Sequence, residues 1–381
     1  MNVEGEKTPL LLPPFEAATG TTVDIQALPW TAAHEKILTA YAGGSLPDVL
    51  MVANSWLAEL AMLGAIAPVP ASLATGLLPS ARAAATIDGR VRGVPWIVDT
   101  QMQFYRRDLL NAAGYAAPPS DWAGWKTMAH AVKRRRPDDF AVLMLLDWPE
   151  QLMHFAAQQP ESMLRDRSAR GNFRAPGFRA ALAFYKSLFD ERLAPPITGT
   201  QLGSSLTAFA RGWFAILPAG VDFTGDLTSR AAEVPRASWG VAEMPGARGP
   251  ADGLLAGSSL VVTSTARDPN RAWQLVEYLT APSAQLRLHA ITGDLPSRAS
   301  AWTAPQLARD PVAATFGGQL ARGAVAPAVP EWARIIDEVQ KLAERMVRGQ
   351  FGVDEAARLM DTRVDTLLAK RRWLLDRGHI A

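Results

Sequence analysis

Residues 88–110 of the chain read DGRVRGVPWIVDTQMQFYRRDLL. The second half of this stretch is typical of extended backbone, because the apolar Met102 and Phe104 alternate with Gln101 and Gln103. A helix is expected to begin near Asp108. We interpret the stretch as strand followed by helix, and the same alternation continues on its N-terminal side.

The residues before this stretch contain two further strand-and-helix pairs. Thr22–Ala27 alternates with period two, and a helix is expected to open at Pro29-Trp30-Thr31, with Thr31 as its cap. Asp48–Val52 is apolar after its first residue, which is typical of a strand buried on both faces, and a second helix is expected over residues 55–63. This order predicts a mostly parallel sheet with helices on both faces.

The residues after the stretch are largely helical in pattern. Helices are expected over residues 121–136, after Asp268-Pro269, over residues 331–347 and over residues 354–368. The first of these ends in the basic run Lys133–Arg136, which we interpret as a solvated helix end rather than a patch that binds nucleic acid or anionic lipid.

Length and composition exclude several classes of protein. The 381 residues suggest two or three domains, and the absence of cysteine excludes disulfide scaffolds, thiol nucleophiles and cysteine-based metal sites. A net charge of +2 is too small for a protein that neutralises nucleic-acid phosphates. We see no membrane-spanning segment and no signal peptide, so the protein is either cytosolic or numbered after removal of an export signal. The 12 tryptophans are either core residues or ring faces for a ligand.

Motifs of catalysis are incomplete. His34-Glu35 begins like a zinc motif, but Leu38 replaces the second histidine, and Gly257-Ser258-Ser259 is not followed by the glycine of a nucleophile elbow. There is no phosphate-binding glycine loop. We therefore expect no catalytic residue, no metal and no cofactor, although carboxylates that pair only in the folded chain leave a glycan-processing enzyme as an alternative.

Eight segments in order resemble the extracellular solute-binding proteins of ABC transporters, in particular the group that binds maltose and trehalose. The segments are Phe15–Val23, Leu46–Val49, Leu57–Pro68, residues 88–110, Pro118–Trp122, Ala256–Val262, Trp273–Leu279 and Thr292–Arg298. Each is weak alone, and their order and spacing together are specific.

The resemblance implies an α/β fold of two lobes, the type II-like periplasmic-binding-protein fold, with a hinge between the lobes. We expect lobe 1 to hold residues 1–106 and 258–305, and lobe 2 to hold residues 107–257 and 306–381. In this family ligands bind in a cleft at the carboxyl ends of the strands and the lobes close on them.

The function implied is a periplasmic, monomeric receptor that delivers a small α-linked oligosaccharide, such as maltose or trehalose, to the membrane permease subunits of an ABC importer. A polyamine or an organophosphate stays an alternative ligand for the same fold. Phosphate would need a cluster of cations, and a polyamine would need several carboxylates such as Asp99, Asp147 and Asp222.

Sugar recognition needs aromatic rings and planar polar groups, and such residues follow the expected strands. The candidates are Trp30, Asn54, Ser55, Trp56, Trp96, Asp99, Trp148, Gly220, Asp222, Phe223, Gly257, Ser258, Arg298 and Trp332. Each candidate also has an alternative to ligand contact. Each tryptophan could instead pack in the core, Asp99 could be a surface carboxylate or a hydrogen-bond acceptor near the hinge, and Arg298 could form an ion pair.

Two departures from the family pattern affect these expectations. Gly220-Val221-Asp222-Phe223 stands where many relatives carry Gly-Pro-Trp, so a carboxylate replaces a ring and Phe223 could restore stacking. The first strand of the family is also missing, because Gly5-Glu6 already matches the helix after it. We expect this loss to expose a sheet edge and to weaken ligand binding. Calorimetric titration of this chain beside an N-terminally extended one tests that expectation, and equal affinities would contradict it.

Overall fold

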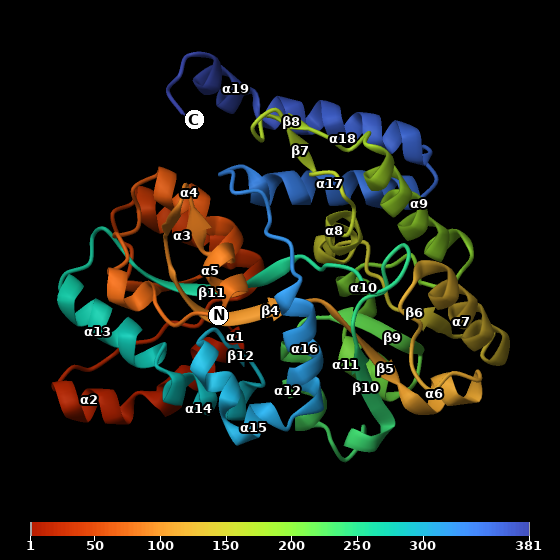
Figure 1. Ribbon diagram of the computed structural model, residues 1–381, viewed down its shortest axis with the longest axis horizontal. Helices are drawn as coiled ribbons and strands as arrows, with labels where there is room; N and C mark the ends of the chain where they lie inside the picture. The colour runs from red at the N-terminus through yellow and green to blue at the C-terminus, as the bar shows by residue number, and fades with distance from the viewer. Residues whose placement is uncertain (1, 381) are drawn as a thin grey trace. The chain divides into compact units, whose positions relative to one another are not determined.

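A computed structural model describes residues 2–380 of the chain (Figure 1). The chain divides into two compact units. Unit 1 comprises Met1–Asp99 and Leu255–Ala314, and unit 2 comprises Thr100–Leu254 and Thr315–Ala381. Each unit is therefore built from two separate segments, and the chain passes from one unit to the other three times. No helix among the described residues is long and apolar enough to cross a membrane.

The three crossings differ from the expected boundaries. The first lies after Asp99 rather than after residue 106, because β5 (Met102–Arg106) pairs with strands of unit 2. The second lies after Leu254 and the third after Ala314, inside helix α16 (Pro311–Ala321). The expected boundary near residue 305 is wrong because the chain stays with unit 1 through the short helix α15 (Pro305–Ala308).

Unit 1 is built on a four-stranded sheet in the order β1-β11-β4-β12. The strands are β1 (Val49–Ala53), β11 (Leu255–Val262), β4 (Val94–Thr100) and β12 (Leu295–Pro296). A short hairpin of β2 (Thr86–Ile87) and β3 (Arg90–Val91) immediately precedes β4 in the chain. The helices are α1 (Asn2–Lys7), α2 (Pro13–Thr19), α3 (Trp30–Ala42), α4 (Leu57–Met62), α5 (Pro79–Ala84), α13 (Pro269–Leu279), α14 (Pro282–Thr292) and α15.

Two apolar clusters cover the two faces of this sheet. Leu50 and Val52 of β1 pack with Ile37 of α3 on one face, and Val262 of β11 packs with Val276 of α13 on the other. Side chains of β1 alternate between buried and half-buried, so the expectation of a strand buried evenly on both faces is wrong. The layered arrangement with helices on both faces is confirmed.

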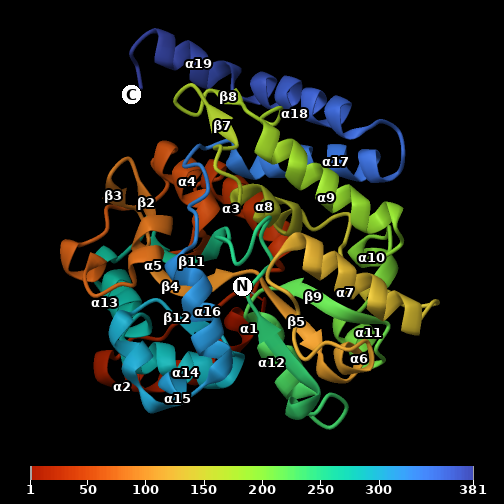
Figure 2. The same cartoon turned by 45° about the vertical axis from the view of Figure 1, so that its right-hand side comes forward.

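Unit 2 has a second four-stranded sheet in the order β10-β5-β9-β6, with β10 (Trp239–Ala242), β9 (Phe214–Ala219) and β6 (Phe140–Val142). A small hairpin is formed by β7 (Leu164–Arg165) and β8 (Arg170–Gly171). Its helices are α6 (Arg107–Ala112), α7 (Trp122–Arg135), α8 (Pro149–Ala157), α9 (Pro176–Asp190), α10 (Gly199–Leu202), α11 (Ser205–Ala210), α12 (Asp222–Ser229), α17 (Trp332–Val347), α18 (Val353–Leu367) and α19 (Ala369–Asp376). Helices α9, α17 and α18 pack against one another, as Figures 1 and 2 both show.

The direction of the strands corrects the expectation of mostly parallel sheets. The pairs β1–β11, β4–β12, β5–β10 and β5–β9 are antiparallel, and β6–β9 is parallel. Adjacent strands here come from segments far apart in the chain: Val49 of β1 faces Val262 of β11. The rule for parallel neighbours holds for strands that a crossover helix joins directly, and it does not fix the direction of neighbours that are paired without such a connection.

Thr22–Ala27 forms no assigned strand, which corrects a second expectation. Its alternation is real, since Val23 and Ile25 contact the apolar cluster of unit 1. The Val23 amide, however, donates to Glu16 Oε1 at 2.9 Å rather than to a neighbouring strand. A period-two pattern therefore predicts a half-buried extended segment, but it does not predict whether a neighbouring strand forms hydrogen bonds with that segment.

Candidate functional site

The carboxyl end of β1 carries an aromatic cluster in unit 1. Asn54, Ser55 and Trp56 follow the strand in a short 3-10 turn, so the strand end itself fixes where Trp56 lies. The Trp56 indole meets the Trp30 indole edge to face, with 5.7 Å between ring centroids. Trp30 begins α3 and is 38% exposed. Two of the candidate tryptophans thus lie together, and one of them presents open ring surface.

His34 completes this cluster and was not among the candidates. Its imidazole stacks on Trp56 at 4.8 Å with 23° between the ring planes. Nε2 of His34 lies 2.8 Å from Oε2 of Glu59 on α4, and both side chains are mostly buried. The spacing from Trp30 to His34 is one helical turn, so the two side chains share a face of α3. That spacing is the sequence signal that could have identified His34.

Two of the polar candidates near the same strand end, Asn54 and Ser258, are buried. Asn54 is 8% exposed and its Oδ1 accepts a hydrogen bond from Ser259 Oγ at 2.7 Å. Ser258 is 4% exposed and faces Ala53 across the β1–β11 ladder. Ser55 is half-buried. The Asn54–Ser259 bond ties the 3-10 turn to β11, so these side chains hold the position of Trp56.

The structure explains why a glycine occupies position 257 without any contact to a ligand. Its φ is +109°, and a Cβ built there would lie 2.3 Å from the Ile97 carbonyl oxygen and 3.2 Å from the Asp99 amide nitrogen. Only a residue without a side chain lets β11 approach β4 this closely. Asp99 itself is half-buried at the last position of the first segment of unit 1. Gly257 therefore sets the backbone around Asp99.

Three aromatic candidates lie in the interior, so ligand contact is corrected to core packing for them. Trp96 is 3% exposed and its Nε1 donates to the Leu279 carbonyl at 3.0 Å. Phe223 is 4% exposed and meets the ring of Phe104 at 5.2 Å. Trp332 is 2% exposed in the main cluster of unit 2. Each falls on the apolar stripe of its element, which sequence alone cannot separate from a ring that faces a ligand.

Arg298 also has partners within unit 1. Its Nε donates to the Thr280 carbonyl at 3.0 Å, and its Nη1 donates to the Thr75 carbonyl. The guanidinium group joins two loops through their backbones, so the expectation of sugar contact or of an ion pair is corrected to a structural role.

In unit 2 the candidates gather at the ends of two neighbouring strands. Because β6 and β9 are parallel, their carboxyl ends lie at the same edge of the sheet. The chain beyond β6 leads to Asp147 and Trp148, and the chain beyond β9 leads to Gly220 and Asp222. Oδ1 of Asp147 accepts a hydrogen bond from the Gly199 amide at 2.8 Å.

Trp148 is half-buried and precedes α8, whereas Asp222 is exposed and begins α12. Glu150, exposed in the first turn of α8, was missed by the sequence reasoning although it lies two residues beyond Trp148. This edge of unit 2 thus combines one ring with several carboxylates, which is the chemistry that binds sugar hydroxyls. No group of three or more metal-binding side chains occurs within residues 2–380.

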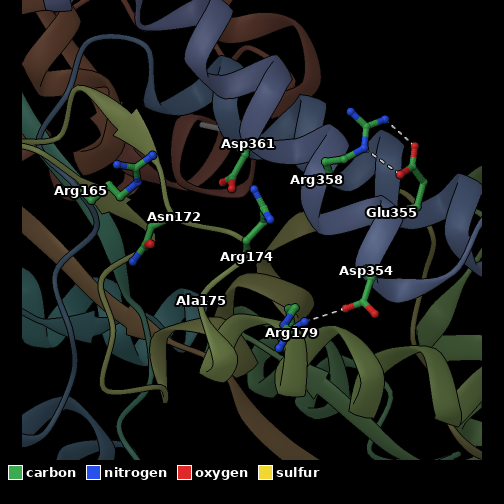
Figure 3. Close-up of a pocket in the computed structure, with 9 residues that line it drawn as sticks. All are labelled: Arg165, Asn172, Arg174, Ala175, Arg179, Asp354, Glu355, Arg358 and Asp361. Atoms are coloured by element: carbon green, nitrogen blue, oxygen red, sulfur yellow. Dashed lines mark hydrogen bonds and ion pairs between the residues drawn. The ribbon is translucent and has the colours of Figure 1, made fainter.

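A hollow of unit 2 lies apart from all of these residues. It has a volume of about 800 Å³ and lies between the β7–β8 hairpin, the start of α9 and the start of α18 (Figure 3). Its lining is dominated by arginine and carboxylate side chains. None of the candidate sugar-binding residues lines it.

Comparison with known proteins gives consistent matches. A family model described as bacterial extracellular solute-binding protein matches residues 11–315. The solved structure of the sugar-binding protein MalE from Xanthomonas citri is 41% identical with a TM-score of 0.90, and the match covers 98% of this chain and 97% of that chain.

Two more distant structures share the fold. The GacH receptor of Streptomyces glaucescens, solved unliganded and with acarbose, is 22% identical with a TM-score of 0.87, and the match covers 97% of this chain and 96% of that one. Maltose-bound MalE3 of T. maritima is 22% identical with a TM-score of 0.85, covering 96% and 97%.

Proposed function

The chain belongs to the bacterial extracellular solute-binding protein family, and from this premise we propose that it binds a small α-linked oligosaccharide for an ABC importer. Two observations support the sugar. The chain is similar over nearly its whole length to a sugar-binding MalE, and unit 1 presents the cluster of Trp30, His34 and Trp56.

The aromatic cluster is the single observation that carries the choice of a sugar. A pyranose ring has apolar C–H faces and polar edges, so it pairs with the face of an indole and with acceptors around the rim. Trp30 supplies an exposed indole beside Trp56. At the strand ends of unit 2, Asp147, Glu150 and Asp222 are acceptors for hydroxyl groups. A maltose-like sugar has apolar ring faces and many hydroxyls, so each set taken by itself offers a kind of contact that such a sugar can make.

The test is a tryptophan-fluorescence titration against maltose, trehalose, maltotriose and the β-linked cellobiose. We expect a saturable change with at least one α-linked sugar and a weaker response to cellobiose. Trp56→Ala should lower the affinity by at least about tenfold, because a stacked ring is lost. Trp373→Ala is the matched control, since Trp373 is 50% exposed on α19 and belongs to no candidate site. No response to any sugar, or saturation by spermidine alone, would contradict the proposal.

Delivery to membrane permease subunits, a periplasmic location and a monomeric state are parts of the same proposal. The closure expected from the resemblance also stays a prediction. Small-angle scattering with and without maltose would measure it as a smaller radius of gyration in the sugar-bound protein. An unchanged radius together with confirmed binding would contradict closure but not sugar recognition.

A further inference from the structure

The hollow of unit 2 brings together an unusual number of charged side chains. Four guanidinium groups line it, those of Arg165, Arg174, Arg179 and Arg358, together with three carboxylates, those of Asp354, Glu355 and Asp361. They come from two stretches far apart in the sequence, residues 165–179 and 354–361. Figure 3 shows Arg174 and Asp361 close to one another, with the Arg179–Asp354 and Arg358–Glu355 pairs on the side of α18. The lining carries one more positive charge than negative charge.

Two of the four arginines are already neutralised. Nη1 of Arg179 lies 2.9 Å from Oδ1 of Asp354. Arg358 pairs with Glu355 through two hydrogen bonds, of 2.8 Å from Nε and 2.6 Å from Nη2. A third, Arg165, donates to the Gly171 carbonyl at 3.1 Å and to the adjacent Asp166. These bonds fix the walls of the hollow.

Arg174 is the remaining cation. Its guanidinium group makes no hydrogen bond or ion pair with any residue that the structure describes, and it is exposed. Figure 3 shows it reaching from the loop before α9 toward Asp361 on α18. Oδ1 of Asp361 accepts a hydrogen bond from the Phe173 amide at 2.7 Å. Burial raises the pKa of Asp361, and the neighbouring Asp365 raises it further, so this carboxyl holds its negative charge less firmly than an exposed one.

The backbone adds to the positive character of the same place. Helix α9 has 15 residues and begins beside Arg174, and no side chain caps its first turn. The amino end of a helix carries a partial positive charge, and its first amides lack partners within the helix. Ala175 and Arg179 at this helix end line the hollow. A Cβ built on Gly177 would lie 2.3 Å from Glu161 Oε2, so that carboxylate offsets part of the charge of the helix end.

We propose that this hollow binds an oxyanion, a phosphate or carboxylate group carried by a small polar molecule, with Arg174 as its principal contact. A guanidinium group matches two oxygens of either group in a bidentate geometry. The volume of about 800 Å³ is far larger than one phosphate, so it leaves room for a polar body beside the ion-paired walls. The site is separate from the proposed sugar site, because none of its residues is a sugar candidate.

The experiment is calorimetric titration of the full chain with inorganic phosphate and, in a separate arm, with citrate. The stronger of the two identifies which oxyanion chemistry the hollow prefers. We expect one-to-one binding that weakens as salt rises from about 20 mM to about 200 mM, because screening shortens the reach of the charges. Arg174→Gln should lower the affinity by about tenfold or more. The matched control is Arg309→Gln, which removes an exposed arginine outside the hollow.

A second variant should increase the affinity for the oxyanion. Misfolding would lower that affinity, so an increase cannot be explained by a damaged fold. Asp354→Asn releases Arg179 from its ion pair and adds one unit of positive charge to the lining, so we expect an affinity several-fold higher than that of the wild type. Saturating maltose should leave the anion affinity unchanged. Absence of heat with both probes, or equal loss in Arg174→Gln and Arg309→Gln, would overturn the proposal.

Discussion

The imidazole of His34 lies flat against the indole of Trp56, 4.8 Å from it, while its Nε2 is held 2.8 Å from Glu59 Oε2. The carboxylate fixes the orientation of the imidazole, and the imidazole in turn backs the indole. Such a surface loses little conformational freedom when a sugar ring stacks on it. This contact between α3 and α4 thus lies directly behind the proposed binding surface.

Glu59→Ala is accordingly predicted to weaken sugar binding more than it weakens the fold. We expect the affinity for maltose to fall about threefold to tenfold because the His34–Trp56 pair becomes mobile. The free energy of unfolding should fall by less than about 1 kcal/mol, as is usual for a partly exposed polar contact between side chains. Calorimetry and urea unfolding measure the two effects. Glu344→Ala, which breaks a comparable pair with Arg348 in unit 2, is the control. Unchanged affinity in Glu59→Ala would show that the pair has no such role.

Substitutions of Trp332 can test whether this residue packs in the core or contacts the ligand. It is 2% exposed among the apolar residues of unit 2. Trp332→Ala should cost about 3–5 kcal/mol of unfolding free energy, and Trp332→Phe should cost less and leave the affinity for maltose unchanged. Trp373→Ala, at an exposed position, should change stability by less than about 0.5 kcal/mol. A tenfold loss of affinity in Trp332→Phe at unchanged stability would instead return Trp332 to the ligand site.

Gly257 is predicted to tolerate no side chain. In Gly257→Ala the new methyl group would press on the Ile97 carbonyl, and the φ of +109° is strained for any residue with a Cβ. We expect a loss of about 2–4 kcal/mol in unfolding free energy. Gly352→Ala is the control, because a Cβ there meets nothing within 4 Å and its φ is negative. Thermal unfolding of both variants checks this, and equal melting temperatures would refute the packing explanation.

The fold could be predicted where a pattern is local. The helices over residues 122–135, 269–279, 332–347 and 353–367 match the expected ranges closely, since an apolar stripe at helical spacing reports its own element. Strand direction could not be predicted in this way. β1 pairs with β11 more than 200 residues later, and nothing within either strand specifies that partner or its orientation.

The residues of the candidate site also differ in how well the sequence could predict them. Trp56 closely follows the end of β1 and Trp30 begins α3, and the structure brings the two rings together. Trp96 and Trp332 have equally suggestive positions but point inward. Which side of an element faces the core depends on the helices that pack on it, and this information is spread over distant segments. His34 was overlooked because its partner Glu59 is 25 residues away.

The last prediction concerns His154, a residue of α8 that neither the fold pattern nor the sugar site explains. It is completely buried, and neither ring nitrogen has a hydrogen-bond partner among the described residues. A Cβ added to Gly253 would lie 2.3 Å from its Cε1, so the imidazole packs directly on a backbone without a side chain. Desolvation lowers the pKa of His154 to about 3, whereas in the unfolded chain it is about 6.5.

Between those two values the unfolded chain binds a proton that the folded chain does not. The free energy of unfolding therefore decreases as the pH falls through this range, by up to about 1.4 kcal/mol per pH unit from this residue. His154→Leu removes the titrating group and its unbonded nitrogens, so the variant should lose clearly less stability than the wild type between about pH 7 and about pH 4. His379→Leu, at an exposed histidine, should follow the wild type. Urea unfolding at both pH values measures the difference, in which the titration of all other groups cancels. If His154→Leu and the wild type lost the same stability on acidification, the folded protein would have to accommodate a charged imidazole, and hence water, at this buried position of α8.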